Sequence, residues 1–224
     1  MIGFRIRKRT KAVSPALVRD FLELPVANVS DCMQRLFAAG PTLRPMHDGS
    51  PMGGPAFTVR TRPGDNLMIH KALHLAQPGD VIVVDGGGDL TNALVGELMV
   101  ATAQRRGLAG LVLYGAIRDA RSLREGRFPV FAAGVTHRGP YKDGPGEINV
   151  PIAIDGMVIS PGDLVMGDDD GVLAVPLDQA AEVLRAAQDK LKLEAQMMQA
   201  IREGTQNIDW IDASLRQRGC IFED

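Results

Sequence analysis

The sequence predicts an α/β fold in which a mixed sheet is flanked by helices. Three short apolar runs, Val81–Val84, Leu111–Tyr114 and Val130–Ala133, are typical of strands that are buried on both faces. Two segments with helical patterns, Asn66–Ala76 and Thr91–Arg106, stand before and between them. This alternation favours a sheet with a parallel portion, and ligands of such sheets usually bind beyond the carboxyl ends of the strands.

Two short helices are predicted near the N-terminus. Ser14 and Pro15 combine an N-cap residue with a proline at the first helical position, which predicts a helix from there. Ser30 is predicted to cap a second helix, Asp31–Ala39, whose first acid suits a helix start. The stretch Pro41–Pro55 is rich in glycine and proline, so we expect an irregular loop.

The predicted core begins at Ala56–Arg62, where polar and apolar residues alternate as in a half-buried strand. Short strands of an antiparallel portion are expected later in the chain, at Ile148–Ile154, Met157–Ile159 and Leu173–Val175. A long helix is predicted at Leu177–Glu203, and it would pack either on its own sheet or on a neighbouring subunit. We therefore predict a helical extension at residues 1–55, an α/β core at 56–176 and a C-terminal helical extension at 177–224.

Composition and charge narrow the class of protein. The chain has 224 residues, of which 45% are hydrophobic, and its 25 basic residues nearly balance its 27 acidic ones. This balance argues against nucleic acid as the main partner and favours a small molecule. Cys32 and Cys220 are far apart and form neither a zinc motif nor a disulfide framework. The sequence contains no apolar run that would span a membrane, so we expect a cytoplasmic protein with no membrane partner.

Three motifs suggest metal or phosphate binding, and a simpler interpretation is favoured for each. His70 and His74 are four residues apart on a predicted helix, but no glutamate base lies between them, which favours a structural or surface role. Asp168–Gly171 does not fit the register of a calcium-binding EF-hand loop and is better explained as a turn between strands. Asp85–Asp89 contains three glycines but lacks the lysine of a phosphate-binding loop, so close passage of chain segments is favoured.

The most informative residues are the segment Gly96–Met99 and the adjacent pair Arg118 and Asp119. The pair follows the predicted strand Leu111–Tyr114, at the position where α/β sheets place functional side chains. A guanidinium presents a planar set of donors to a carboxylate, and an aspartate offers a hard oxygen ligand to Mg²⁺ or Mn²⁺. On spacing alone, a surface ion pair explains the two residues equally well.

These residues and several other motifs resemble one known family. The shared motifs are Val29–Asp31, Gly54–Ala56, Pro78–Asp80, Gly96–Glu97, Gly115–Asp119, Pro129–Phe131, Pro161–Asp163 and Asp168–Val172. In them the chain closely resembles the RraA-like family, which includes class II pyruvate aldolases acting on 4-hydroxy-4-methyl-2-oxoglutarate and 4-carboxy-4-hydroxy-2-oxoadipate. The family pattern is an acid, twenty residues, Arg-Asp, two residues and a further acid. Glu97, Arg118 and Asp119 match this pattern, whereas Ser122 stands where the last acid is expected.

The resemblance also implies a fold, an assembly and a set of roles. The fold would be a compact swivelling β/β/α sandwich that assembles as trimers or hexamers, with sites between subunits. Arg118 and the backbone amides around Leu98 and Met99 would hold the pyruvyl carboxylate, within a binding segment that starts at Gly96. Asp119 would ligate the divalent metal, Mg²⁺ or Mn²⁺, and Glu97 would act through water around the metal.

The activity that follows is a divalent-metal-dependent cleavage of 4-hydroxy-2-oxo acids to pyruvate and a second 2-oxo acid. The cation stabilises the enolate that forms, so no lysine Schiff base is needed. Oxaloacetate decarboxylation passes through the same enolate and is an expected side activity. A different class of function is also open, because some RraA-like proteins bind ribonuclease E and inhibit RNA processing. Ser122 further leaves room for a homologue specialised for another 2-oxo acid.

Overall fold

The computed structural model describes residues 2–223. By compactness the chain divides after Ala187 into two units. The larger unit contains the sheet and the helices packed on it, and the smaller one contains α6 from Gln188 onward and the whole of α7. The three segments expected from the sequence, residues 1–55, 56–176 and 177–224, stay a prediction about domain organisation.

Helices and strands alternate through the middle of the chain, from β3 to β7, and a run of strands follows. In order, they are β1 (Phe4–Ile6), α1 (Pro15–Leu22), α2 (Val26–Cys32), β2 (Arg44–Pro45), β3 (Met52–Thr61), α3 (Leu67–Leu75), β4 (Val81–Asp85), β5 (Ala93–Val95), α4 (Glu97–Arg105), β6 (Gly110–Ile117), α5 (Ala120–Glu125), β7 (Val130–Val135), β8 (Gly146–Ile148), β9 (Ile152–Ile154), β10 (Met157–Ile159), β11 (Leu164–Asp168), β12 (Gly171–Val175), α6 (Ala180–Glu203) and α7 (Asp209–Gln217).

The large sheet is mixed, as the sequence predicts. Its main path runs β1-β8-β3-β4-β6-β7-β2, with β5 paired to β6 and the hairpin of β11 and β12 joined to β3. Strands β3, β4, β6 and β7 pair in parallel, and β5 is parallel to β6. Strands β8 and β11 are antiparallel to β3, and β2 is antiparallel to β7. The carboxyl ends of the five parallel strands therefore meet at one edge of the sheet.

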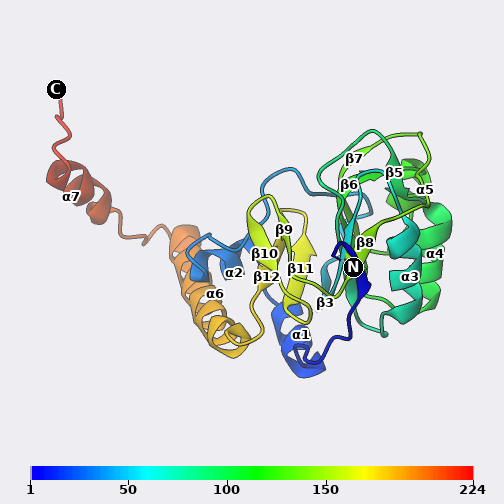
Figure 1. Ribbon diagram of the computed structural model, residues 1–224. Helices are drawn as coiled ribbons and strands as arrows, with labels where there is room; N and C mark the ends of the chain where they lie inside the picture. Colours follow the sequence, from blue (N-terminus) through cyan, green and yellow to red (C-terminus); the bar gives the residue numbers. More distant parts are fainter. Residues whose placement is uncertain (1, 224) are drawn as a thin grey trace. The chain divides into compact units, whose positions relative to one another are not determined.

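The central strands are covered on both faces, which explains their uninterrupted apolar sequences. In β4, Ile82 and Val84 belong to the core beneath the helices, whereas Val81 and Val83 belong to the core on the opposite face. Helices α3, α4 and α5 cover the first face, and the hairpin of β9 and β10 lies on the second (Figure 1). The result is a helix layer, a sheet and a smaller β layer, which confirms the predicted α/β class.

The second N-terminal helix differs from the prediction. A helix at Asp31–Ala39 is wrong, because α2 ends at Cys32 and the next residues leave the helical conformation. Gln34 and Arg35 have φ angles of 57° and 60°, which a right-handed helix does not allow. Residues 37–39 form backbone hydrogen bonds with β12 instead. Pairing with a distant strand therefore outweighs the local helical pattern.

Three other predictions need new boundaries. The predicted helix Thr91–Arg106 contains a strand first, since Ala93–Val95 pairs with β6 before α4 begins. The predicted strand Ile148–Ile154 is interrupted at Asn149, whose φ of 56° breaks the extended backbone. The predicted loop before residue 56 is partly strand, because β3 starts at Met52 and pairs there with β11.

The long C-terminal helix is confirmed as α6, although only its first turns are buried. The buried side chains are those of Ala180, Val183, Leu184 and Ala187. Large apolar side chains are exposed further along α6 and in α7, namely Leu193, Met197, Met198, Ile201, Trp210, Ile211 and Leu215. Over residues 2–223, none of the helices combines the length and the hydropathy that crossing a membrane requires.

Candidate functional site

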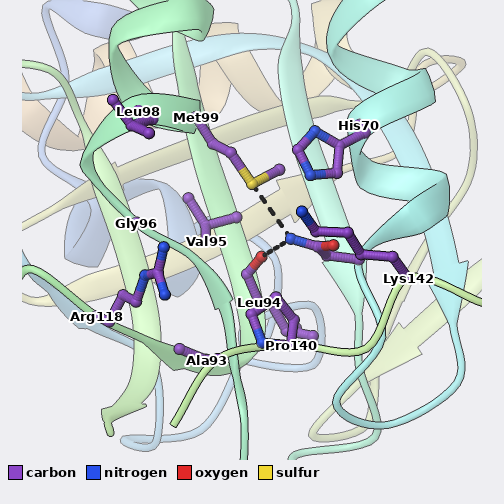
Figure 2. A pocket seen from close by; sticks show the side chains of 12 residues that line it. His70, Ala93, Leu94, Val95, Gly96, Leu98, Met99, Arg118, Pro140 and Lys142 are labelled. Carbon is purple, nitrogen blue, oxygen red and sulfur yellow. Dashed lines mark hydrogen bonds between the residues drawn. The ribbon is translucent and has the colours of Figure 1, made fainter. Parts of the chain in front are cut away.

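A cavity of about 290 Å³ lies at the carboxyl edge of the parallel strands. Its walls come from the start of α3, from β5 and the first turn of α4, from the residue after β6, and from the loop that follows β7. Four residues predicted for the site line it, namely Gly96, Leu98, Met99 and Arg118 (Figure 2). Glu97 and Asp119 are not part of the cavity wall, but a hydrogen bond from the Glu97 N–H to Asp119 Oδ2 joins the two predicted segments beside it.

Arg118 and Asp119 come directly after β6 and are partly open to solvent. The Arg118 N–H donates to the carbonyl oxygen of Val95 at 3.0 Å, which ties the pair to the end of β5. Arg118 Nε lies 3.7 Å from Asp119 Oδ2, with 44% and 40% of the two side chains exposed. An ion pair this exposed adds little stability. Both groups can therefore reach a ligand without losing a contact that the fold requires.

Gly96 explains why this pair can lie against the start of α4. A Cβ atom on Gly96 would lie 2.5 Å from Asp119 Oδ2 and 2.9 Å from Arg118 Cγ. Asp119 Oδ2 instead accepts the N–H of Glu97 at 3.0 Å, so its negative charge lies at the positive end of α4. Asp119 adopts a left-handed backbone with φ 58°, a region that aspartate enters more readily than most residues. The absence of a side chain at residue 96 is thus a condition of the site.

The first turn of α4 leaves one amide for a ligand. The N–H groups of Met99 and Val100 donate to the carbonyl oxygen of Gly96 at 3.1 and 3.2 Å, and the N–H of Glu97 is taken by Asp119. For the Leu98 N–H, the part of the chain that the structure describes supplies no acceptor. Helix N-termini favour anions because such amides point outward. The geometry therefore favours Leu98 over Met99 as the amide that meets a carboxylate.

Basic groups line the cavity from two sides. Figure 2 shows Arg118 on one side and His70 with Lys142 on the other. The lining contains no acidic side chain among the described residues. Burial is the main cause that lowers the pKa of His70, and the charges of Lys142 and His74 lower it further. Arg118 on one side and Lys142 on the other therefore suit the cavity to a small anion with negative charge at both ends, whereas the lowered pKa reduces the charge that His70 contributes.

Sequence reasoning missed Asn66, His70 and Lys142 as cavity residues. In the sequence His70 stands out only as a metal ligand together with His74, and His74 is exposed. The described residues contain no group of three or more His, Cys, Asp or Glu side chains that could hold a metal by themselves. Lys142 belongs to the glycine-rich loop after β7. A basic residue in a loop at the carboxyl edge of the sheet is the one feature of the sequence that indicates Lys142 as a cavity residue.

The other motifs have structural roles, as predicted. Asp168–Gly171 forms the turn between β11 and β12. In the segment Asp85–Asp89, the N–H groups of Gly86 and Gly88 both donate to the carbonyl oxygen of Tyr114 at 3.1 Å, so they do not point at an anion. Ser122, which stands where the family pattern has an acid, is half-buried in α5 and is not part of the cavity wall.

Comparison with known proteins gives the family. A family model described as "RraA-like: Aldolase/RraA" matches residues 26–174. The chain belongs to the RraA-like family. A protein of Halalkalibacterium halodurans named "Putative 4-hydroxy-4-methyl-2-oxoglutarate aldolase" is 42% identical over 173 residues, which cover 77% of this chain and 82% of that protein. The 4-hydroxy-4-methyl-2-oxoglutarate aldolase of Thermus thermophilus is 38% identical over 112 residues, which cover 50% of this chain and 68% of that one.

A solved structure agrees with this assignment. An RraA protein of Streptomyces coelicolor, described as an unusual member of the RNase ES inhibitor RraA protein family, superposes with a TM-score of 0.76 and 30% identity. The match covers 83% of this RraA-like chain and 97% of the Streptomyces chain. The resemblance inferred from the sequence motifs is thereby confirmed, and relatives of this family carry names from both functional classes considered above.

Proposed function

We propose that this RraA-like protein is a divalent-metal-dependent aldolase that cleaves 4-hydroxy-2-oxo acids, such as 4-hydroxy-4-methyl-2-oxoglutarate, to pyruvate and a second 2-oxo acid. The observation that carries the proposal is the Arg118 and Asp119 pair, held against the N-terminus of α4 beside a cavity with a basic lining. Such substrates carry a carboxylate at each end, which matches basic groups on two sides of the cavity. The aldolase names of two relatives support the same reaction class.

The residues beside the cavity fit a magnesium or manganese ion. Mg²⁺ is commonly held by one or two carboxylates and completes its shell with water and substrate oxygens. Asp119 offers a partly exposed carboxylate, of which one oxygen already accepts the N–H of Glu97. Glu97 is exposed at the start of α4 and is bonded to Asp119 through its backbone N–H, and its carboxylate is assigned to the water around the ion. A bound ion would stabilise the negative charge that develops on the 2-oxo group during cleavage.

The side chains of the site then divide the work of cleavage. Arg118 binds the carboxylate next to the 2-oxo group through two parallel N–H donors, and the Leu98 N–H adds a third. When the C3–C4 bond breaks, its electron pair moves onto the 2-oxo group and leaves the enolate of pyruvate. The C4 hydroxyl loses its proton and becomes the carbonyl group of the second product. Glu97 accepts that proton through water, and protonation of C3 completes pyruvate.

His70 and Lys142 are assigned to the second carboxylate of the substrate. Both lie across the cavity from Arg118 (Figure 2), and the lysine ammonium suits an anion whose exact angle varies. Oxaloacetate also has two carboxylates, and losing one as CO₂ breaks the bond to C3 and leaves the same enolate. Oxaloacetate decarboxylation is therefore proposed as a side activity of the same site.

The test is pyruvate release by the purified chain from 4-hydroxy-4-methyl-2-oxoglutarate and from oxaloacetate, with Mg²⁺, with Mn²⁺ and with a chelator. We expect release that needs the metal and returns when metal is restored. Arg118→Ala should lower kcat/KM by about 10²–10³-fold, since it removes a charged donor pair aimed at the substrate. Arg121→Ala is the matched control, because Arg121 is exposed nearby and, within residues 2–223, its ion-pair partner is Glu125 on the surface of α5. No release from either substrate with either metal would refute the proposal.

A second candidate function is regulation of ribonuclease E by binding. It is favoured by the match to the Streptomyces protein, which covers 97% of that chain. Purified ribonuclease E would be mixed with this chain, and complex formation and RNA cleavage would be measured beside pyruvate release. Inhibition by a complex, in the absence of pyruvate release, would select this function over the aldolase. The aldolase proposal also includes an assembly, a cytoplasmic homo-oligomer that is a trimer or a hexamer. Light scattering would measure the mass of this assembly.

A further inference from the structure

Asp65 is a buried carboxylate near the cavity that the proposed chemistry does not use. It is fully buried, and it lies two residues before the first residue of α3. Its Oδ1 accepts the N–H of Leu67 at 2.9 Å, and its Oδ2 accepts those of Asp143 at 2.7 Å and Gly144 at 2.9 Å. Arg62 Nη2 lies 3.2 Å from the same Oδ2. Both oxygens thus have the donors that a buried carboxylate needs.

These donors join two segments that are distant in the sequence. One is the start of α3, and the other is the loop after β7 that carries Lys142. Two backbone hydrogen bonds lie beside the carboxylate, from Asn66 N–H to the Tyr141 oxygen at 3.0 Å and from Tyr141 N–H to the Gly64 oxygen at 2.9 Å. The residues before and after Lys142, Tyr141 and Asp143, are therefore both tied to the start of α3.

The position of Lys142 relative to His70 depends on this connection. His70 lies in the first turns of α3, whose start is bonded to Asp65, and both His70 and Lys142 line the cavity. The Asp65 side chain does not line the cavity. It can affect a ligand only through the segments that it holds. A loop that is already fixed loses less conformational freedom when its lysine closes on an anion.

We propose that Asp65 is a positioning residue, which holds the Lys142 loop against α3 and so selects substrates that carry a second carboxylate. This inference rests on the proposed function, because it takes Lys142 and His70 as the groups that meet that carboxylate. Loss of the Asp65 charge releases the Asp143 and Gly144 amides and lets the Lys142 loop move away from the cavity. The pyruvyl half of the substrate, held at Arg118, is not affected.

The test compares two substrates in the Asp65→Asn variant of the full chain. One is 4-hydroxy-4-methyl-2-oxoglutarate, and the other is 4-hydroxy-2-oxopentanoate, which has the same pyruvyl half and no second carboxylate. KM for the first should rise about 10–100-fold with kcat changed by less than about threefold, while KM for the second stays unchanged. Lys142→Met should give the same selective loss. The double variant should lose no more than Lys142→Met alone, because both changes remove one interaction.

Asp80→Asn is the matched control, and Arg62→Met is a milder second variant. Asp80 is 1% exposed and lies at the amino end of β4, away from the cavity, where its oxygens accept Gln77 N–H and pair with Arg9, both at 2.8 Å. Asp80→Asn should reduce stability without changing the ratio of kcat/KM between the two substrates. Arg62→Met removes one donor to Asp65 together with two weaker contacts to the Lys142 loop, at the Asp143 carboxylate and the Tyr141 ring. Because the backbone donors to Asp65 remain, it should shift that ratio in the same direction as Asp65→Asn but less.

The outcomes separate this inference from the proposed function. An equal loss on both substrates in Asp65→Asn, or an unchanged ratio in Lys142→Met, overturns the positioning role while leaving the aldolase in place. If Asp65→Asn does not fold, an unchanged ratio in Arg62→Met has the same meaning. Release of pyruvate from neither substrate by the unaltered chain refutes the proposed function, and the positioning role with it.

Discussion

Asp65 and Asp119 are two aspartates beside one cavity, and their surroundings are opposite. The Asp65 carboxylate is fully buried and accepts three backbone N–H groups, two of them from a distant loop. The Asp119 side chain is 40% exposed and accepts one N–H, from Glu97. A carboxylate whose lone pairs are filled by the chain holds the fold, whereas one with an open oxygen can take a ligand. The hydrogen-bond partners thus separate a structural aspartate from a candidate metal ligand.

The largest effect is expected from Asp119→Asn, and it should fall on activity. The amide keeps the shape of the side chain and tolerates the left-handed backbone, but it removes the charge proposed to hold the metal. We expect kcat/KM for pyruvate release to fall by about 10²–10³-fold. The unfolding temperature should change little, because the side chain is partly exposed. Full metal-stimulated pyruvate release by this variant would show that Asp119 is not the ligand.

The next effect is expected from Asp65→Asn, and it should fall on stability. In the unaltered chain these backbone N–H groups donate to a carboxylate oxygen. In the variant an amide nitrogen would face them, which leaves buried donors without an acceptor. A loss of about 3 kcal/mol is expected, equivalent to a decrease of roughly 6–12 °C in the unfolding temperature for a domain of this size. Thermal unfolding followed by circular dichroism measures it, with Asp119→Asn as the control. Equal shifts in the two variants would remove the distinction between the two aspartates.

The two aspartates also differ in how far the sequence could predict them. Arg118 and Asp119 follow an apolar strand, and the carboxyl edge of a parallel sheet is where functional side chains are expected, so their location could be predicted. Asp65 could not be predicted, because two of its donors lie 78 and 79 residues away in the chain. A local pattern contains no information about which distant amides will converge on a carboxylate. The same limit applies to Lys142, which reaches the cavity from the loop after β7.

Dependence on distant segments also explains which elements of the fold can be predicted well from the sequence. Helix α3 lies close to the segment predicted from its pattern, since its apolar side chains are buried against the sheet. Helix α6 also lies close to its predicted segment, although only its first turns are buried. The helix expected at Asp31–Ala39 failed, because part of that segment pairs with β12. β5 was missed for the same reason, since its residues Ala93–Val95 become a strand only beside β6. Segments whose structure depends on a distant partner are therefore the ones that periodicity cannot assign.

The smallest effect is expected from the charge of His70, on the basic side of the cavity. Burial is the main cause that lowers its pKa below the usual 6.5, and the charges of Lys142 and His74 contribute in the same direction. The unfolded chain therefore binds this proton more readily than the folded one. As the pH falls from the pKa of His70 in the unfolded chain toward its lower pKa in the folded chain, His70 therefore reduces the free energy of unfolding. Above the pKa of the unfolded chain it has no such effect.

His70→Gln tests this contribution. When the pH is lowered from about 7.5 to about 5.5, the free energy of unfolding should fall less in the variant than in the unaltered chain. The difference between the two falls should be smaller than the loss expected for Asp65→Asn. A proton NMR titration of His70 gives its pKa directly, and Lys142→Met should raise that pKa without restoring the usual value, because burial is the larger cause. An unreactive dicarboxylate should raise it as well, since an anion beside Lys142 offsets the repulsion. A His70 that titrates at its usual pKa in the free protein, and does not respond to the dicarboxylate, would place the second carboxylate elsewhere.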